Sequence, residues 1–351
     1  MNDPELSARR ARLEPLLESA RTLKDPSTER GRAARARLVQ SSGLSPEGVD
    51  FALGRCLESD PSERELEQLI RATPTAQVAH VLLSANVFVA AHRAIAIGLA
   101  ASQTVQVRAS RREPEMAELL LAGAPQSFEL VKELAPHAGD RLWAYGSDET
   151  MDEVAVTLPP GVAFHGHGSG FGIGVIDRSA SGDALAELLP KLAEDIALFD
   201  QRGCLSPRVV LVNAGPDAAC AIAEALAREL EVLEARVPRG RLETTEAAEI
   251  AKYRDTASFA GQLFAAGQGF VSVGNDATWL LPPSGRNLHL LPCDDVQASL
   301  AALRPMITSC AFAGDPALLG ALRRALPGAR HCRFGEMQRP PFDGPVDRRE
   351  L

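Results

Sequence analysis

Residues 77–110 read QVAHVLLSANVFVAAHRAIAIGLAASQTVQVRAS, and this stretch decides the fold. It opens with an apolar, β-rich run, continues with an Ala-rich stretch of helical spacing, and ends with a second strand-like run, TVQVRAS. A strand, a helix and a strand within about 35 residues have the size of a βαβ unit. The segment therefore predicts a parallel β-sheet as the framework of the fold.

The same alternation continues along the chain. GVAFHGHGSGFGIGVID at 161–177 reads as a Gly-rich strand or hairpin, and SFELVKELAP at 127–136 reads as a helix. Further strands are expected at RLWAYGS (141–147), PRVVLVN (207–213), VSVGNDATWLL (271–281) and NLHLLPC (287–293). Helical patterns between these strands predict an α/β fold, and the Pro-rich C-terminal tail is expected to lie on the surface.

Composition restricts the class of protein. The chain has 351 residues, of which 45% are hydrophobic, which is ordinary for a soluble globular protein of about two domains. Its net charge of −9 argues against bulk binding of nucleic acid or of an anionic membrane. No apolar run reaches the roughly 18 residues of a membrane helix, and the charged N-terminus does not resemble a secretory signal. The six cysteines are scattered without a CxxC motif, which indicates reduced thiols in a cytoplasm.

The loop DQRGCLSP at 200–207 carries the sharpest chemical signal. It places Cys204 between a helix and an apolar strand, where a nucleophile can be reached by substrate. Gly203 lets another backbone approach closely, and Arg202 could stabilise a thiolate. The alternative interpretation is that Cys204 is a small buried hydrophobic residue, as most free cysteines are.

Two further strand ends carry polar groups. Asn86 follows the first strand, and its side-chain N–H could donate to an oxyanion. The alternative, which the residue alone favours, is an N-cap of the next helix. Arg108, Arg111 and Arg112 follow the second strand, where ligands of open α/β sheets bind. They could grip a phosphate, and arginine there suits a 2′-phosphate better than a ribose hydroxyl. The alternative is a solvated basic turn.

The Gly-rich stretch holds His165 and His167, which alternate onto one face of a strand. No third ligand has convincing spacing, so no metal site is expected. The glycines indicate close approach of a ligand or a flexible turn. The GxGxxG fingerprint, the P-loop, GxSxG and HExxH are all absent from the sequence.

Taken in this order, the motifs resemble the aldehyde dehydrogenase superfamily. Within it they are most similar to the acyl-CoA reductase branch, known from the fatty-acid reductase of bacterial luminescence. The resemblance runs from about residue 77 to the C-terminus. It rests on the strand–Asn–helix–strand opening, the turn AYGSDE at 144–149, and the loop DQRGCLSPRVVLV at 200–212.

The resemblance implies roles for individual residues. Cys204 would be the thiol nucleophile, and Asn86 with the backbone N–H of Cys204 would form the oxyanion hole. Arg108 and Arg111 would lie on the adenosine ribose and favour NADPH over NADH. The resemblance adds four residues to the cofactor site: Ser110, Gly146, Ser147 and Gly166.

One departure from the superfamily bears on the reaction. Hydrolytic members carry a glutamate before a Gly-rich stretch, whereas this chain has His165, Gly166 and His167 at the comparable place. Without a general base, water deacylates a thioester slowly, so the acyl group would accept hydride instead. His165 or His167 could replace the missing base.

We therefore expect an aldehyde-dehydrogenase-like enzyme with a Rossmann-like cofactor domain, an α/β catalytic domain and a helical N-terminus. The expected divisions are a helical segment packed on the cofactor domain (1–74), the NADP-binding domain (75–197), the catalytic domain (198–332) and a C-terminal tail (333–351).

The expected reaction is NADPH-dependent reduction of an acyl thioester, such as an acyl-CoA, to an aldehyde. An aldehyde dehydrogenase that makes a free acid and a non-catalytic scaffold member are the alternatives. A cytoplasmic location is expected, while the acyl chain, an acyl-donor protein partner and a homo-oligomer stay open.

Overall fold

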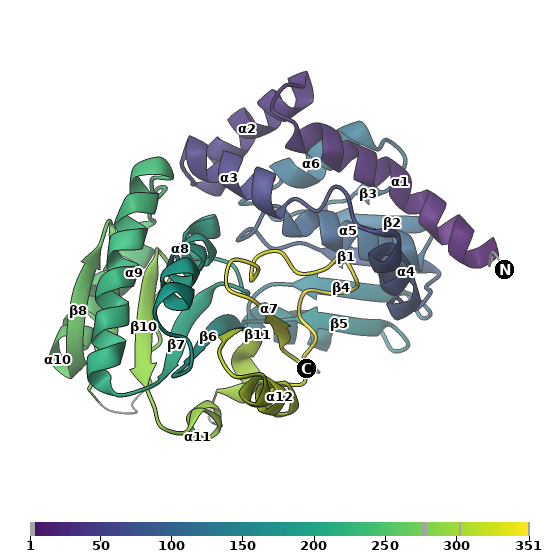
Figure 1. Cartoon of the computed structure of the whole chain (residues 1–351). Coiled ribbons are helices and arrows are strands. Elements are labelled where there is room, and N and C mark those ends of the chain that lie inside the picture. The colour runs from purple at the N-terminus through teal and green to yellow at the C-terminus, as the bar shows by residue number, and fades with distance from the viewer. Residues whose placement is uncertain (1–3, 276–278, 302, 350–351) are drawn as a thin grey trace. The chain divides into compact units, whose positions relative to one another are not determined.

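The computed structural model describes residues 4–275, 279–301 and 303–349. The chain forms two compact units, each built on its own sheet (Figure 1). The first unit comprises the chain up to Ser169 together with Pro341–Val346. The second comprises Gly170–Pro340 and continues from Asp347. The C-terminal segment therefore contributes residues to both units.

The first unit consists of helices and a five-stranded sheet. Its elements are α1 (Pro4–Lys24), α2 (Glu29–Ser42), α3 (Pro46–Cys56), α4 (Glu63–Ala72), β1 (Val78–Leu82), α5 (Ala90–Ala101), β2 (Thr104–Arg108), α6 (Glu115–Gly123), β3 (Glu129–Leu130), β4 (Arg141–Tyr145), α7 (Asp148–Thr157) and β5 (Ala163–His167).

The strand order β3-β2-β1-β4-β5 places β1 in the centre, and every pair is parallel. Register puts the last residue of β1, Leu82, beside Arg108 of β2 and Ala144 of β4. The carboxyl ends of these strands therefore meet at one edge. The strand order reverses between β1 and β4, which is where doubly wound sheets bind their ligands.

The N-terminal helices begin at strong caps. Ser45 caps α3, and Ser62 with Glu65 forms a capping box at the start of α4. Helix α1 packs on α5 and α6. Arg9 and Arg12 of α1 donate to the carbonyls of Ala100 and Leu99, at the C-terminal end of α5, at 2.6 and 2.8 Å. These bonds satisfy carbonyl groups that a helix end leaves open.

The second unit is a seven-stranded sheet with helices on both faces. Its elements are β6 (Phe171–Asp177), α8 (Asp183–Ala197), the 3₁₀ helix η1 (Leu198–Gln201), β7 (Pro207–Asn213), α9 (Pro216–Arg236), α10 (Thr244–Ala260), β8 (Gly261–Ala266), β9 (Gly269–Gly274), β10 (Asn287–Pro292), α11 (Val296–Leu300), the 3₁₀ helix η2 (Arg304–Met306), β11 (Ile307–Ala313), α12 (Pro316–Ala325) and β12 (Arg330–Cys332).

The strand order is β12-β11-β6-β7-β10-β9-β8, and only the pair of β8 with β9 is antiparallel among the described strands. The α/β class with parallel sheets is therefore confirmed. Helices α8 and α9 pack together, and α9 covers β8 to β10 (Figure 1). The opposite side carries a core of aliphatic side chains from β6, β11, α11 and α12.

Three local expectations are wrong. Residues 161–177 form neither one strand nor a hairpin, because β5 pairs in the first sheet and β6 pairs with β7 and β11 in the second. The helix expected at 127–136 is absent, and β3 lies there instead. The strand expected at 271–281 ends at Gly274, and residues 276–278 lie outside the described part of the chain. The unit boundary before β6 also differs from the expected division at 197.

The C-terminal tail is not a surface segment. Phe334, Met337 and Phe342 are buried, at 4%, 1% and 2% exposure. In the second unit, the carboxylate of Asp195 on α8 accepts the N–H of Gly335 at 2.5 Å. Apolar side chains and a buried acceptor thus hold a stretch that composition alone marks as exposed.

In the first unit, Arg93 of α5 binds Pro341–Val346, the C-terminal segment that belongs to this unit. Its guanidinium donates to the carbonyls of Pro341 and Gly344, both at 2.8 Å, and lies over the ring of Phe342. Glu58 pairs with the same guanidinium. Among residues 4–275, 279–301 and 303–349, no helix combines the length and hydropathy that crossing a membrane requires.

His92 of α5 generates a test of acid sensitivity. The side chain is fully buried, and its ring centroid lies 5.4 Å from that of Phe342. Within the described chain, neither ring nitrogen has a hydrogen-bond partner. Burial, with a smaller effect of the Arg93 charge, lowers the pKa of His92 to about 3. Between about pH 6.5 and pH 3, His92 is therefore protonated in the unfolded chain and neutral in the folded chain.

A lowered histidine pKa stabilises the fold above about pH 6.5, and this stability is lost as the pH falls toward 3. We expect His92→Phe to gain about 2–3 kcal/mol over the wild type at pH 4.5, relative to the difference at pH 7.5. Urea unfolding at both pH values measures it. His137→Gln, at an exposed histidine, is the control. Equal pH dependence in wild type and His92→Phe would contradict the assignment.

Candidate active site

Cys204 lies in a tight turn between η1 and the N-terminal end of β7, in the second unit. Three consecutive carbonyls of this turn are held from neighbouring strands. Thr308 Oγ1 donates to Cys204 O at 2.5 Å, Ser309 Oγ to Leu205 O at 3.0 Å, and Gly172 N to Ser206 O at 2.8 Å. The turn is therefore fixed through its carbonyl groups by β11 and β6.

The backbone before Cys204 is strained. Phe199, Asp200 and Gln201 are buried and adopt left-handed φ values of 56°, 49° and 67°. Such conformations cost about 1–3 kcal/mol each for residues with a side chain. They persist only where the surroundings determine them, and they gather at functional sites.

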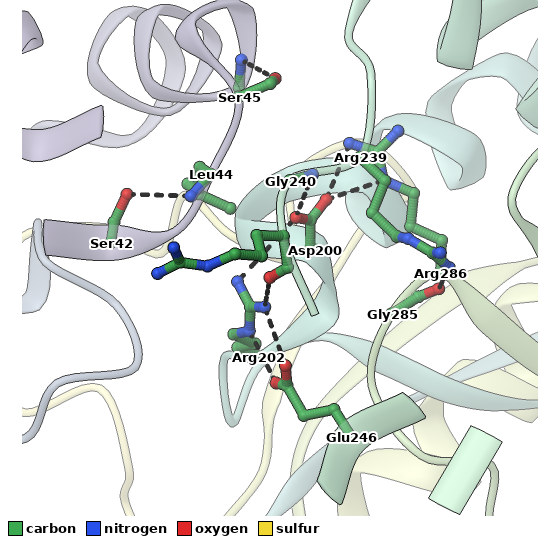
Figure 2. Close-up of polar contacts among 12 residues, drawn as sticks. Ser42, Leu44, Ser45, Asp200, Arg202, Arg239, Gly240, Glu246, Gly285 and Arg286 are labelled. Atoms are coloured by element: carbon green, nitrogen blue, oxygen red, sulfur yellow. Dashed lines mark hydrogen bonds and ion pairs between the residues drawn. The ribbon is translucent and has the colours of Figure 1, made fainter. Parts of the chain in front are cut away.

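Asp200 supplies the main restraint (Figure 2). Its Oδ1 accepts from Arg286 Nε at 2.9 Å and Nη2 at 2.8 Å, and its Oδ2 accepts from Gly240 N at 2.9 Å. Arg286 is 2% exposed and also binds Glu234 at 2.8 Å. Two guanidinium nitrogens on one buried carboxylate oxygen make this a charge-assisted, orienting ion pair.

Gln201 closes the loop. Its Nε2 donates to the carbonyls of Pro207 and Asn287, both at 2.6 Å, and its Oε1 accepts from the N–H of Asn287 at 2.8 Å. The side chain therefore joins both ends of the Cys204 loop to the start of β10. A fully buried amide with every polar atom satisfied holds one conformation.

Gly172 of β6 explains part of the Gly-rich stretch. A Cβ at this position would lie 2.4 Å from Leu205 O and 2.6 Å from Met337 Cε. No side chain fits there while the Cys204 loop keeps its place. The close approach that the sequence suggested for a ligand is, at Gly172, an approach of the candidate nucleophile loop.

Cys204 is a neutral thiol in this state. Burial raises its pKa to about 11, with a further increase from the Asp347 charge. The Arg349 charge and the backbone N–H groups of Cys204 and Leu205 act in the opposite direction. The chain thus offers the sulfur both hydrogen-bond donors and nearby charges.

Arg202, which the sequence suggested as a thiolate partner, forms an ion pair with a carboxylate instead. Its Nε and Nη2 bind the carboxylate of Glu246 at 2.9 and 3.1 Å (Figure 2). Asp200 adds a second negative charge at 3.9 Å. The suggested role of Arg202 is therefore wrong, because α10 supplies Glu246 to neutralise it.

In the first unit, the expected cofactor residues gather at the carboxyl edge of the sheet. Asn86 lies exposed in the loop between β1 and α5. It is not the N-cap of α5, because that position is Val89, which makes no side-chain capping bond. The capping alternative is excluded, and no described contact engages the Asn86 amide.

The basic turn follows β2. Arg108 and Ser110 are half-buried, while Arg111 is exposed. Across the described residues, none of the guanidinium groups of Arg108, Arg111 and Arg112 pairs with a carboxylate. Three cationic groups without acidic partners at a ligand-binding edge fit an anionic group such as a phosphate.

The Gly146–Ser147 turn lies beside them, after β4. Ser147 is the N-cap of α7, and its Oγ accepts from Thr150 N at 3.3 Å. Asp148 and Glu149 already occupy the first turn of α7. Their negative charges weaken this helix end as a phosphate site, so the arginines are the better anchor.

The two histidines of β5 are fixed by stacking. His165 stacks on Trp143 with a centroid distance of 5.0 Å, and His167 stacks on Tyr145 at 4.7 Å. Burial, and then Arg141, lowers the pKa of His165, so its imidazole is neutral near pH 7. Gly166 between them lies 2.9 Å, measured from an added Cβ, from the Phe164 ring. Packing against Phe164 is thus one reason for a glycine at this position.

No metal centre is evident in the part of the chain that the structure describes, because no three His, Cys, Asp or Glu side chains gather with suitable geometry. Sequence reasoning missed Asp200, Gln201, Arg286 and Gly172 as residues that hold the Cys204 loop. It also missed Asp347 and Arg349. The run of three buried polar or aromatic residues before Cys204 gave no sign of left-handed backbone.

The chain is similar to known proteins both in sequence and in fold. Residues 47–347 match the family described as "Acyl-CoA reductase (LuxC)". A search among curated protein sequences finds no match. Solved structures with the same fold include an oxidoreductase from Marinobacter aquaeolei, at 13% identity and TM-score 0.72 over 94% of this chain and 78% of that one.

Two dehydrogenase structures are also similar. A putative aldehyde dehydrogenase from Burkholderia cenocepacia has 16% identity and TM-score 0.70, covering 93% of this chain and 79% of that one. An NAD-dependent benzaldehyde dehydrogenase from Corynebacterium glutamicum has 16% identity and TM-score 0.69, covering 94% and 83%. These similarities establish an aldehyde-dehydrogenase-like fold.

The contacts of Gly172 yield a second test. We expect Gly172→Ala to lower catalytic turnover by at least about 10-fold, because the added methyl displaces the Cys204 loop or the tail. Overpacking should also destabilise the second unit by about 1–3 kcal/mol. Steady-state kinetics and thermal unfolding measure both. Gly215→Ala is the matched control, because a Cβ there meets no atom within 4 Å. Equal activity of both variants would refute the role of Gly172.

Proposed function

The chain belongs to the acyl-CoA reductase (LuxC) family, and we propose that it reduces an acyl thioester to an aldehyde with NADPH through a covalent thioester on Cys204. The observation that carries this proposal is the Cys204 loop, in which three consecutive carbonyls accept hydrogen bonds from β6 and β11. A loop with this rigidity suits a nucleophile.

The first half-reaction is a thiol exchange. The Cys204 sulfur attacks the thioester carbonyl, the bond to the coenzyme A sulfur breaks, and the thiol proton leaves with that sulfur. Since the resting thiol has a raised pKa, deprotonation accompanies attack instead of preceding it. The backbone N–H of Cys204 and the Asn86 amide are the proposed donors to the developing oxyanion.

NADPH is the proposed cofactor of the second half-reaction, and when bound it supplies the hydride that reduces the acyl group to the aldehyde. The residues proposed to hold it are Arg108, Ser110, Arg111, Gly146 and Ser147, with Gly166 behind them. The unpaired guanidinium groups of Arg108 and Arg111 support a 2′-phosphate at the edge of the first sheet. The acidic first turn of α7 gives Ser147 the weakest support in this set.

Reduction is favoured over hydrolysis because no described carboxylate is available to activate water at Cys204. Asp347 acts electrostatically on the thiol, but Arg349 binds both of its oxygens, at 2.9 and 2.6 Å. A carboxylate held in this way is a poor base. His165 is likewise held, by Trp143 and by Arg141 at 3.2 Å.

The surroundings of the reaction belong to the same proposal. A cytoplasmic location and an acyl-donor protein that delivers the acyl group both agree with the family and with the composition. A homo-oligomer would be detected by light scattering of the purified chain.

The covalent intermediate gives the decisive experiment. Enzyme mixed with acyl-CoA without NADPH should accumulate one acyl group on Cys204, because hydrolysis lacks the roughly 10²–10⁴-fold of general-base catalysis. Intact mass and peptide mapping locate the adduct, and NADPH should then discharge it as aldehyde. Cys204→Ala should form no adduct and no aldehyde. Rapid release of free acid without cofactor would instead support the aldehyde dehydrogenase alternative, and aldehyde formation by Cys204→Ala would exclude Cys204 as nucleophile.

Cofactor choice is tested at Arg111. A charge-assisted bond to a phosphate contributes about 1.5–3 kcal/mol, which corresponds to roughly 10–150-fold in affinity. We expect Arg111→Glu to weaken NADPH by this factor while NADH binding changes little, as measured by fluorescence titration of each nucleotide. Arg64→Glu, at an exposed arginine of α4 outside the basic turn, is the control. An unchanged preference in Arg111→Glu would place its guanidinium in solvent.

A further inference from the structure

The C-terminal segment of the second unit ends in a buried ion pair. Arg349 Nε and Nη2 bind Asp347 Oδ1 and Oδ2 at 2.9 and 2.6 Å, and Arg349 N donates to Oδ1 at 3.0 Å. The two side chains are 8% and 5% exposed. A bidentate pair at this burial keeps both charges at fixed positions.

Neighbouring contacts tie this pair to the Cys204 turn. Arg349 Nη1 donates to Pro305 O at 2.7 Å, just before β11. A Cβ on Gly170 would lie 2.4 Å from Thr308 Cγ2 and 2.9 Å from Arg349 Nη2, so Gly170 leaves room for both. Thr308 in turn donates to the carbonyl of Cys204. The pair therefore packs against the residue that fixes the nucleophile.

The charged side chain nearest to Cys204 in the sequence is not available for this role. Arg202, two residues before Cys204, is neutralised by Glu246 and Asp200. The residues that hold the turn from β6 and β11 are Gly172, Thr308 and Ser309, and none of them is charged. Asp347 and Arg349 act on the Cys204 thiol in opposite directions.

We propose that the Asp347–Arg349 pair sets the reactivity of Cys204: Asp347 keeps the sulfur protonated at rest, and Arg349 stabilises negative charge on it during attack. The inference rests on the proposed function of Cys204. Both are positioning residues, since they act on the sulfur and touch no reacting atom of the substrate. A resting thiol is protected from oxidation, because the thiolate is the reactive form.

The balance of the pair has a physical consequence. Removing the carboxylate takes away a negative charge that disfavours the thiolate, so the thiolate becomes more stable. Removing the guanidinium leaves Asp347 unopposed, which disfavours it further. The two substitutions therefore shift thiol titration in opposite directions, whereas a local loss of structure would expose Cys204 in both variants.

The experiment is alkylation of the full chain by iodoacetamide between pH 7 and 10.5, without substrate, with Cys204 followed by peptide mass. At pH 8 we expect Cys204 of Asp347→Asn to react about threefold faster than the wild type, or more, and that of Arg349→Met about threefold slower. The double variant should return toward the wild-type rate, and Arg349→Lys should recover part of the loss. The half-buried Cys220 in the same unit is the internal reference, and its rate should stay constant.

Unchanged rates, or rates that shift in the same direction in both single variants, would overturn the proposal. Activity of Cys204→Ala is measured in parallel. If that variant stays active, the proposed function fails although the thiol titration stands. If it is inactive while the two single variants titrate like the wild type, the inference about the pair fails and the function stands.

Discussion

The buried ion pair between Asp200 and Arg286 is the contact on which the candidate nucleophile depends. The chain leaves helix α8 and must turn sharply before β7, and it does so through left-handed backbone at 199–201. Nothing in that conformation is intrinsically favourable for residues with side chains. Arg286 on one oxygen of Asp200 and the N–H of Gly240 on the other hold this conformation in place (Figure 2). Removing one partner of such a pair typically costs about 3–5 kcal/mol, because the other charge stays buried.

The other residues that support this turn also belong to the second unit. Gly172 on β6 lacks a side chain where the carbonyl of Leu205 approaches, and the tail fills the neighbouring space with Met337. Gln338 reaches from the tail to the hydroxyl of Ser206 at 2.7 Å. The C-terminal residues are therefore part of the support of the nucleophile loop, and the charges that act on the sulfur come from the same segment.

Much of the first unit follows from local sequence. The βαβ pattern at 77–110 gave β1, α5 and β2, and parallel register then brought Asn86, Arg108 and the Gly146 turn to one sheet edge. The roles of individual side chains were harder to predict from the sequence. The sequence permitted Asn86 to be a cap, whereas the N-cap of α5 is Val89, three residues later. It suggested that the glycines around His165 and His167 mark a flexible turn or the close approach of a ligand, yet each histidine stacks on an aromatic residue of β4. Cross-strand neighbours are set by sheet order, which local patterns do not contain.

By itself, the sequence determined the α/β class, the strand that follows Cys204, and the family, because hydrophobic period and motif order are local properties of the chain. Tertiary structure decided which charges lie near the candidate nucleophile. Arg202 is close in sequence but is neutralised by Glu246 of α10, while Asp347 and Arg349 are more than a hundred residues away and face the same turn. Electrostatic interactions depend on distance in space and on burial. Both of these arise only when β6, β7 and β11 pair and the tail packs against them.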